Sequence, residues 1–175
     1  MADPIKTQVY DFLQAIHDKR ISTALVKVFE KVYPRVRTAN ITASLTLNDP
    51  THEGKTCSVN AAAGCAITLP ASTGGGARYR LFIGTTITSN TTTIKVANAS
   101  DIMAGTALLG ADGGNTVNLW ETGASDDTIT MDGSTRGGIK GDYIELEDVA
   151  LNVWFVRFIG SATGAEATPF SATVS

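Results

Sequence analysis

Cys57 and Cys65 are the only two cysteines of this 175-residue chain, and they flank an alanine run in the stretch TCSVNAAAGCAITLP. A pair this close could form a disulfide, bind a metal ion or fill a core. Strand alternation places Cys57 with Val59, and Cys65 with Ile67, on the apolar side of an expected hairpin around residues 61–64. We therefore expect buried, unreactive thiols. A disulfide is the main alternative, and two sulfurs alone make a metal site less favoured.

The other candidates for chemistry are the two histidines, His17 and His52. Neither accompanies a serine or cysteine in a recognisable nucleophile setting. The GKT at 54–56 is similar to the end of a phosphate-binding loop, but Asp49 occupies the position where that loop needs a glycine. A turn entering a strand is the better interpretation. We expect a protein that is not an enzyme and has no cofactor and no metal site.

The acidic residues and the tryptophans also admit non-catalytic interpretations. A solvated loop rim is the favoured account of a group of acidic residues without calcium-loop spacing: Asp126, Asp127, Asp132, Asp142, Glu145, Glu147 and Asp148. Trp154 lies in the apolar run NVWFVRF and is expected in a buried central strand. Trp120 is expected to pack on the core, with stacking on a sugar as the alternative. The TGGG at 73–76 is expected to be a flexible loop before a strand.

Composition and charge limit the class of protein. The longest apolar runs are too short for a membrane span, and the N-terminus shows no secretory signal pattern. We therefore expect synthesis in a cytoplasm. Residues 1–38 carry seven Lys and Arg against four acidic residues, whereas the rest carries seven against thirteen. A basic N-terminal arm on an acidic body is a property that bears on partners rather than on the fold.

Two helices are expected in residues 1–38. The first begins with Asp3 as cap and Pro4 at the first helical position, and it ends near His17. Its apolar stripe consists of Ile5, Val9, Phe12, Leu13 and Ile16. A second stripe ends before Pro34 and consists of Ile21, Leu25, Val28 and Val32, with Phe29 beside it. The stripes are out of phase, so we expect a break near 18–22 with Ser22 as a second cap. A strand over 25–34 is the alternative.

From residue 39 onward the chain is expected to form many short strands. Thr, Gly, Ala, Val and Ile dominate, and turn signals recur every few residues, for example at 48–50, 74–76 and 112–115. There is no alternation with helical patterns, which argues against a parallel α/β sheet. The fold class is therefore mainly β: an antiparallel β-sandwich or jelly-roll-like body over residues 39–175, with a helical N-terminal arm over residues 1–38.

Residues 46–86 resemble a segment common among structural proteins of tailed bacteriophages. The pattern is a Thr-rich strand, then G-K-x-x-x-V-N-x-A-A-G-x-x-I-T-L-P, a Gly loop and a Y-x-F-type strand. The positions that match it are Gly54, Lys55, Val59, Asn60, Ala62, Ala63, Gly64, Ile67, Thr68, Leu69, Pro70, Tyr79 and Phe82. The resemblance covers about a quarter of the chain and excludes the arm. It implies a β-rich virion protein without enzymatic activity, such as a capsid decoration (cement) protein or a head or tail fibre component.

The expected function is therefore decoration and stabilisation of a phage capsid on its outer surface. The expected partners are the major capsid protein and further copies of this chain, as a dimer or trimer, with no membrane and no nucleic acid. The expected docking residues form the arm stripe: Val9, Phe12, Leu13, Ile16, Leu25, Val28 and Phe29. One alternative is a fibre module that binds a host receptor or surface glycan. Another is a cellular β-domain with no role in a virion.

Overall fold

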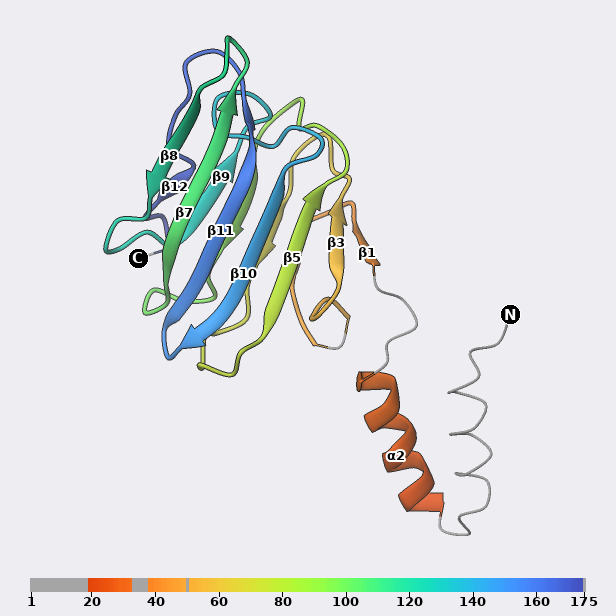
Figure 1. Ribbon diagram of the computed structural model, residues 1–175. Helices are drawn as coiled ribbons and strands as arrows, with labels where there is room; N and C mark the ends of the chain where they lie inside the picture. The colour runs from red at the N-terminus through yellow and green to blue at the C-terminus, as the bar shows by residue number, and fades with distance from the viewer. Residues whose placement is uncertain (1–18, 33–37, 50, 175) are drawn as a thin grey trace. The chain divides into compact units, whose positions relative to one another are not determined.

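The computed structural model describes residues 19–32, 38–49 and 51–174 (Figure 1). The chain divides into two compact units, Met1–Arg37 and Thr38–Ser175. The helix expected from Asp3 to His17 lies outside the described residues, as do its stripe residues.

The described part of the first unit is one helix, α2 (Lys19–Val32). Residues 25–32 are thus helical where a strand over 25–34 was the alternative, but a helical arm over residues 1–38 is not supported. Ser22 lies inside the helix, so it is not an N-cap. The apolar positions Ile21, Leu25 and Val28 recur at the spacing of one helical face, which accounts for the amphipathic pattern. Of the expected helical arm, the described residues contain only this single short helix.

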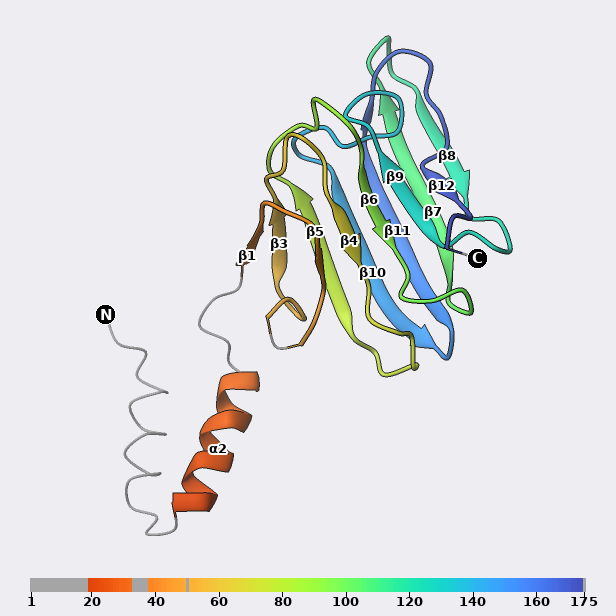
Figure 2. The same cartoon turned by 180° about the vertical axis from the view of Figure 1, so that it is seen from behind.

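The second unit is built from strands in two sheets, so the prediction of a mainly β protein is confirmed (Figures 1 and 2). Sheet A has seven strands in the order β1-β3-β5-β10-β11-β7-β8. Their bounds are β1 Thr38–Ile41, β3 Thr56–Val59, β5 Arg78–Ile83, β7 Ile102–Ala111, β8 Val117–Glu121, β10 Tyr143–Ala150 and β11 Val153–Ala162. Sheet B has five strands in the order β12-β9-β6-β4-β2. Their bounds are β2 Leu45–Thr46, β4 Ala66–Thr68, β6 Thr92–Lys95, β9 Thr128–Met131 and β12 Phe170–Ser171.

The first six strands alternate between the two sheets and form a three-coil stack. Within sheet A, β1, β3 and β5 pair in parallel, and within sheet B, β2, β4 and β6 do the same. The expectation of a purely antiparallel body is therefore wrong, because both sheets are mixed. Each loop in this part carries the chain across to the other sheet rather than back along its own, so successive strands of one sheet run in the same direction.

Stacking of equivalent positions builds the core of this part. The register aligns Cys57 with Ala39 on one side and with Leu81 on the other. These aligned residues are 18 and 24 positions apart in sequence, so the coils do not show as a regular repeat. In sheet B the register stacks Ile67 between two other apolar residues, Leu45 and Ile94. Small and branched apolar side chains thus fill successive layers between the sheets.

The remaining strands complete the sheets with mostly antiparallel pairs. Strand β10 pairs antiparallel with β5 on one side and with β11 on the other. Strand β11 pairs in parallel with β7, and β7 forms a hairpin with β8. In sheet B, β9 pairs antiparallel with β6 and β12. The stack is therefore continued by long strands in sheet A and by short strands in sheet B.

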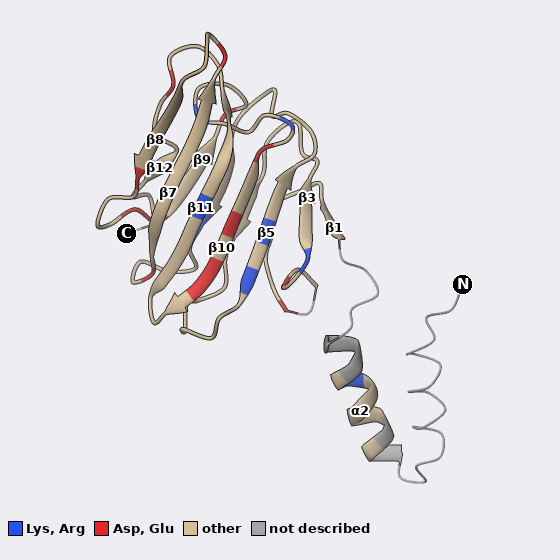
Figure 3. Cartoon of the chain, viewed as in Figure 1, with Lys and Arg blue, Asp and Glu red and all other residues tan. Residues whose placement is uncertain are grey.

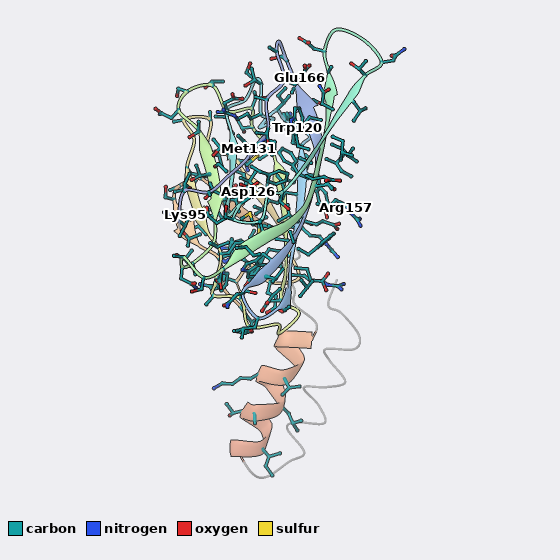
Figure 4. All side chains as sticks on the ribbon, turned by 90° about the vertical axis from the view of Figure 1, so that its left-hand side faces the viewer. Lys95, Trp120, Asp126, Met131, Arg157 and Glu166 are labelled. Atoms are coloured by element: carbon teal, nitrogen blue, oxygen red, sulfur yellow. The ribbon has the colours of Figure 1, made fainter. Side chains whose placement is uncertain are left out.

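The largest core side chains lie on the inner face of sheet A. Trp154, Tyr79 and Phe158 are fully buried, and the rings of Tyr79 and Trp154 contact at a centroid distance of 5.9 Å. The prediction that Trp154 lies in a buried central strand is confirmed. Figure 4 shows Met131 of β9 between the layers, while Arg157 of β11 and Lys95 of β6 lie on opposite outer sides. The core is thus closed between the two sheets.

Candidate interaction surfaces

The residues predicted to dock on a partner are placed only in part. Leu25 is half-buried, whereas Val28 is 55% exposed and its neighbour on the stripe, Ile21, is 51% exposed. Phe29 lies in α2, but its side chain is outside the described residues. The remaining stripe residues are also outside them: Val9, Phe12, Leu13 and Ile16. The described part of the stripe is therefore an amphipathic face with exposed aliphatic side chains.

The two cysteines are core residues, as predicted. Cys57 is fully buried and Cys65 nearly so, and neither is in a disulfide. Burial raises the pKa of the Cys57 thiol to about 11, and it also raises the pKa of Cys65. Both thiols are therefore protonated at neutral pH and are poor nucleophiles.

The hairpin expected between the cysteines is wrong. Strands β3 and β4 belong to different sheets, so residues 60–65 form an arch between the layers. Gly64 has φ +78°, and a Cβ there would meet the Thr91 carbonyl, so this turn requires glycine. Asn60 donates from Nδ2 to Asn40 Oδ1 at 2.6 Å and ties the arch to the preceding coil. The V-N-x-A-A-G part of the motif in residues 46–86 therefore coincides with residues that turn the chain from one sheet to the other.

His52 has a structural environment rather than a catalytic one. Its side chain is buried, and Nδ1 accepts a hydrogen bond from the Asn48 amide at 3.2 Å. Burial is the main cause that lowers the pKa of His52. The imidazole thus holds the turn that leads into β3, which agrees with the turn interpretation of this stretch.

Asp148 is the most heavily hydrogen-bonded acidic residue of the described chain. The amides of Thr73, Gly74 and Gly75 donate to its carboxylate at 2.7–3.1 Å. The Ser72 and Thr73 hydroxyls donate to it at 2.7 and 3.0 Å. Burial opposes ionisation, but these donors prevail and lower the pKa of Asp148 to about 2. The TGGG segment, expected to be a flexible loop, is in fact an anion-binding nest filled by the protein's own carboxylate.

Two further aspartates correct the interpretation of a solvated acidic rim. Asp142 is buried and accepts from the amides of Gly138, Ile139 and Ser161 at 2.7–3.1 Å. Asp127 is also buried and accepts from the amides near the C-terminus. Burial raises the pKa of Asp142 in spite of its donors. These carboxylates organise loops. For Asp142 the donors are a local turn and the more distant Ser161, and for Asp127 they are amides more than 40 residues away, which no local pattern indicates.

The outer faces of the two sheets carry different side chains. Sheet B presents mainly small polar residues, such as Thr46, Thr68 and Thr93. Sheet A presents an apolar row across five adjacent strands, which the pairing register aligns in the order Leu119, Leu108, Ile159, Tyr143 and Phe82. Leu119 and Ile159 are at least half exposed, and Leu108 is 38% exposed. Sheet A therefore holds the main apolar surface among the described strands.

A charged row runs beside the apolar row on the same face. The register aligns Arg157, Glu145 and Arg80 on neighbouring strands, and Figure 3 shows the alternating signs on β11, β10 and β5. Glu145 accepts from Arg157 at 3.3 Å and lies 3.8 Å from Arg80. Each pair is largely solvent-exposed and contributes little to stability on its own.

Trp120 does not add an exposed aromatic to this face. It pairs with the buried Ala107 and packs, half-buried, against the core on the inner side of β8. Core packing of Trp120 is thus the interpretation that agrees with the structure. The described aromatic side chains offer no exposed tryptophan platform for a sugar ring.

The described residues contain no group of three or more His, Cys, Asp or Glu side chains arranged to hold a metal ion. No helix among the described residues is long and apolar enough to cross a membrane. Comparisons with known proteins find no matching family model, no matching curated protein and no matching solved structure. The functional argument therefore depends on the surfaces of the chain itself.

Proposed function

We propose that this protein is a non-enzymatic virion structural protein that decorates and stabilises the capsid shell of a tailed phage. The observation that carries the proposal is the contrast between α2 and the core. The hydrophobic core formed by the described residues lies entirely within Thr38–Ser175, whereas Ile21 and Val28 of α2 stay exposed. A helix of this length is marginal in water by itself, and its exposed aliphatic side chains are those that the proposal assigns to docking.

The partner in this proposal is the major capsid protein, and the docking residues are the arm stripe, of which Leu25, Val28 and Phe29 lie in α2. The second unit then sits on the outer shell. A shell offers many equivalent sites, so contacts that are weak singly add up over the lattice. Each docked copy would bridge neighbouring capsid subunits and oppose the outward pressure of the packaged DNA.

The motif in residues 46–86 supports the same class of protein in a limited way. Its residues form the arch between the sheets and the strands beside it, for example Val59 and Ile67 in the core and Gly64 at the turn. The motif is therefore explained by folding requirements and not by a binding site. It favours kinship with β-rich virion proteins and leaves the docking role to the N-terminal unit.

The test compares the full chain with two variants in co-sedimentation with purified heads of the phage that encodes it. The variant Ile21→Gln/Val28→Gln removes exposed apolar area without touching the core, so we expect it to lose shell binding. The control Thr23→Gln lies on the opposite side of the helix and should bind like the unchanged chain. Equal binding by all three would contradict docking through α2. Binding to host cells or surface polysaccharide instead of heads would favour the fibre alternative.

A further inference from the structure

The outer face of sheet A differs from a typical solvated sheet face. Its apolar row crosses five strands, and the aliphatic members Leu108, Leu119 and Ile159 are 38%, 57% and 50% exposed. Val117, on the same side of β8, is 62% exposed. Contiguous exposed apolar patches on a monomer mark interaction sites when they reach several hundred Å². The outer face of sheet A is therefore a candidate interaction surface.

We propose that this face is a two-fold interface with a second copy of the same chain. The first reason is charge. The charged row and its neighbours carry equal numbers of Arg and Glu side chains: Arg78, Arg80, Arg157, Glu121, Glu145 and Glu147. A face that is neutral with alternating signs does not select a strongly acidic or basic partner. It is complementary to an identical face displaced by one strand.

The register shows how two such faces match. A two-fold axis along the strands, between β10 and β11, places β10 of one copy over β11 of the other at the same height. Glu145 and Arg157 are register partners, so each then meets the opposite charge on the second copy. Tyr143 and Ile159 are likewise partners, so the axis stacks one on the other. The same operation brings Leu108 over Phe82, because both lie at the height of this row.

The size of the face fits a stable dimer. The five strands that carry the row, β5, β10, β11, β7 and β8, hold 6, 8, 10, 10 and 5 residues, 39 in all; at about 3.3 Å per residue and about 4.8 Å between strands they cover about 600 Å². Two such footprints, about 1,200 Å² in total, lie at the lower end of the roughly 1,200–2,000 Å² that specific, stable interfaces bury. Two sheets that pack face to face keep their strand directions within about 30° of each other, so the rows of the two copies stay aligned close to the two-fold axis. The interface is independent of the shell-docking proposal and would form whatever α2 binds.

The test measures the mass of the full chain in solution by sedimentation equilibrium. We expect a species of twice the 18.3 kDa chain mass. Ile159→Lys should weaken dimerisation by about tenfold or more, because it buries an unpaired charge. Leu151→Lys is the matched control, since Leu151 is 70% exposed but lies in the turn between β10 and β11. Dimerisation of Ile21→Gln/Val28→Gln should be unchanged, which separates this interface from α2.

A charge-exchange experiment checks the two-fold arrangement without relying on one variant. Arg157→Glu alone and Glu145→Arg alone should each dimerise about tenfold or more weakly, because like charges then face each other. A mixture of the two variants should form a heterodimer, since each Glu then meets an Arg. Thermal melting of each variant verifies that it folds. A monomeric full chain, a dimer indifferent to Ile159→Lys, or a mixture without heterodimer would overturn the proposal.

Discussion

The two units of the chain differ in how their apolar side chains are covered. In Thr38–Ser175, residues such as Ile67, Trp154 and Phe158 are enclosed between two sheets. In α2, the exposed Ile21 and Val28 are not part of that core. Burial of apolar surface is the main source of folding stability, so the second unit has a core of its own, whereas the exposed side chains of α2 are those that the proposal assigns to docking. Stability and docking should therefore respond to different substitutions.

The largest effect is expected from emptying the core of the second unit. Phe158→Ala removes a fully buried aromatic ring from β11. We expect a loss of about 3–5 kcal/mol in the free energy of unfolding, because the site cannot collapse fully around the cavity. Urea denaturation measures it. A loss below about 1 kcal/mol would show that the sheets are not packed as described.

A smaller loss is expected from the nest around Asp148. Asp148→Asn keeps the size of the side chain but replaces one carboxylate oxygen by an NH2 group, which cannot accept hydrogen bonds from the Thr and Gly amides that donate to it. We expect a loss of about 2–3 kcal/mol, the scale of hydrogen bonds to a charged group. The control Glu147→Gln, next to it in β10 but outward-facing, should change stability by less than about 0.5 kcal/mol.

The same nest makes stability depend on pH. The pKa of Asp148 is lowered to about 2 in the folded state, so its contribution is present above the unfolded value of about 4 and is lost as pH falls toward 2. The contribution of Asp142 to the pH dependence of stability has the opposite sign, because its raised pKa favours the protonated form in the folded state. Urea denaturation of the unchanged chain and of Asp148→Asn between about pH 2 and pH 7 should therefore converge at the acid end. Parallel pH profiles would contradict this account.

The thiols give a prediction about reactivity rather than stability. Cys57 and Cys65 should label slowly with a thiol reagent in the native state and fully in denaturant, because both are buried and their pKa values are raised. A colorimetric thiol titration at neutral pH measures both rates. Rapid labelling of either residue in the folded protein would place it outside the core.

The smallest effect on stability is expected in α2. Ile21→Gln/Val28→Gln alters side chains that are already half exposed, so the free energy of unfolding of the second unit should change by no more than about 0.5 kcal/mol, as for ordinary surface substitutions. A loss of unfolding free energy in this variant as large as that of Phe158→Ala would contradict the difference between the two units.

The sequence predicted local features better than connections. Strand parity placed Cys57, Val59, Cys65 and Ile67 in the core, and the structure agrees. The same stretch could be closed by a hairpin or by an arch, because both need a short turn with a glycine such as Gly64. The arch is chosen by pairing of β3 with β1 and β5, which are distant in sequence.

The polar sites illustrate the same limit. Asp148 and the TGGG segment are separated by more than 70 residues, and no local pattern links a carboxylate to a nest so far away. The sequence does contain a signal, since consecutive glycines permit the positive φ angles that Gly74 and Gly76 adopt in this segment. The apolar row of sheet A was also missed. Its members come from five strands, and only the pairing register brings Leu108, Ile159 and Tyr143 into line.

The measurement that tests the proposed decoration of a phage capsid most directly is the number of copies of this chain in purified virions. Quantitative mass spectrometry against the major capsid protein gives this number. A decoration protein should be present in hundreds of copies, and particles lacking it should release DNA more readily on heating. A handful of copies would point to a fibre or tail component, and absence from the particle would contradict a virion role altogether.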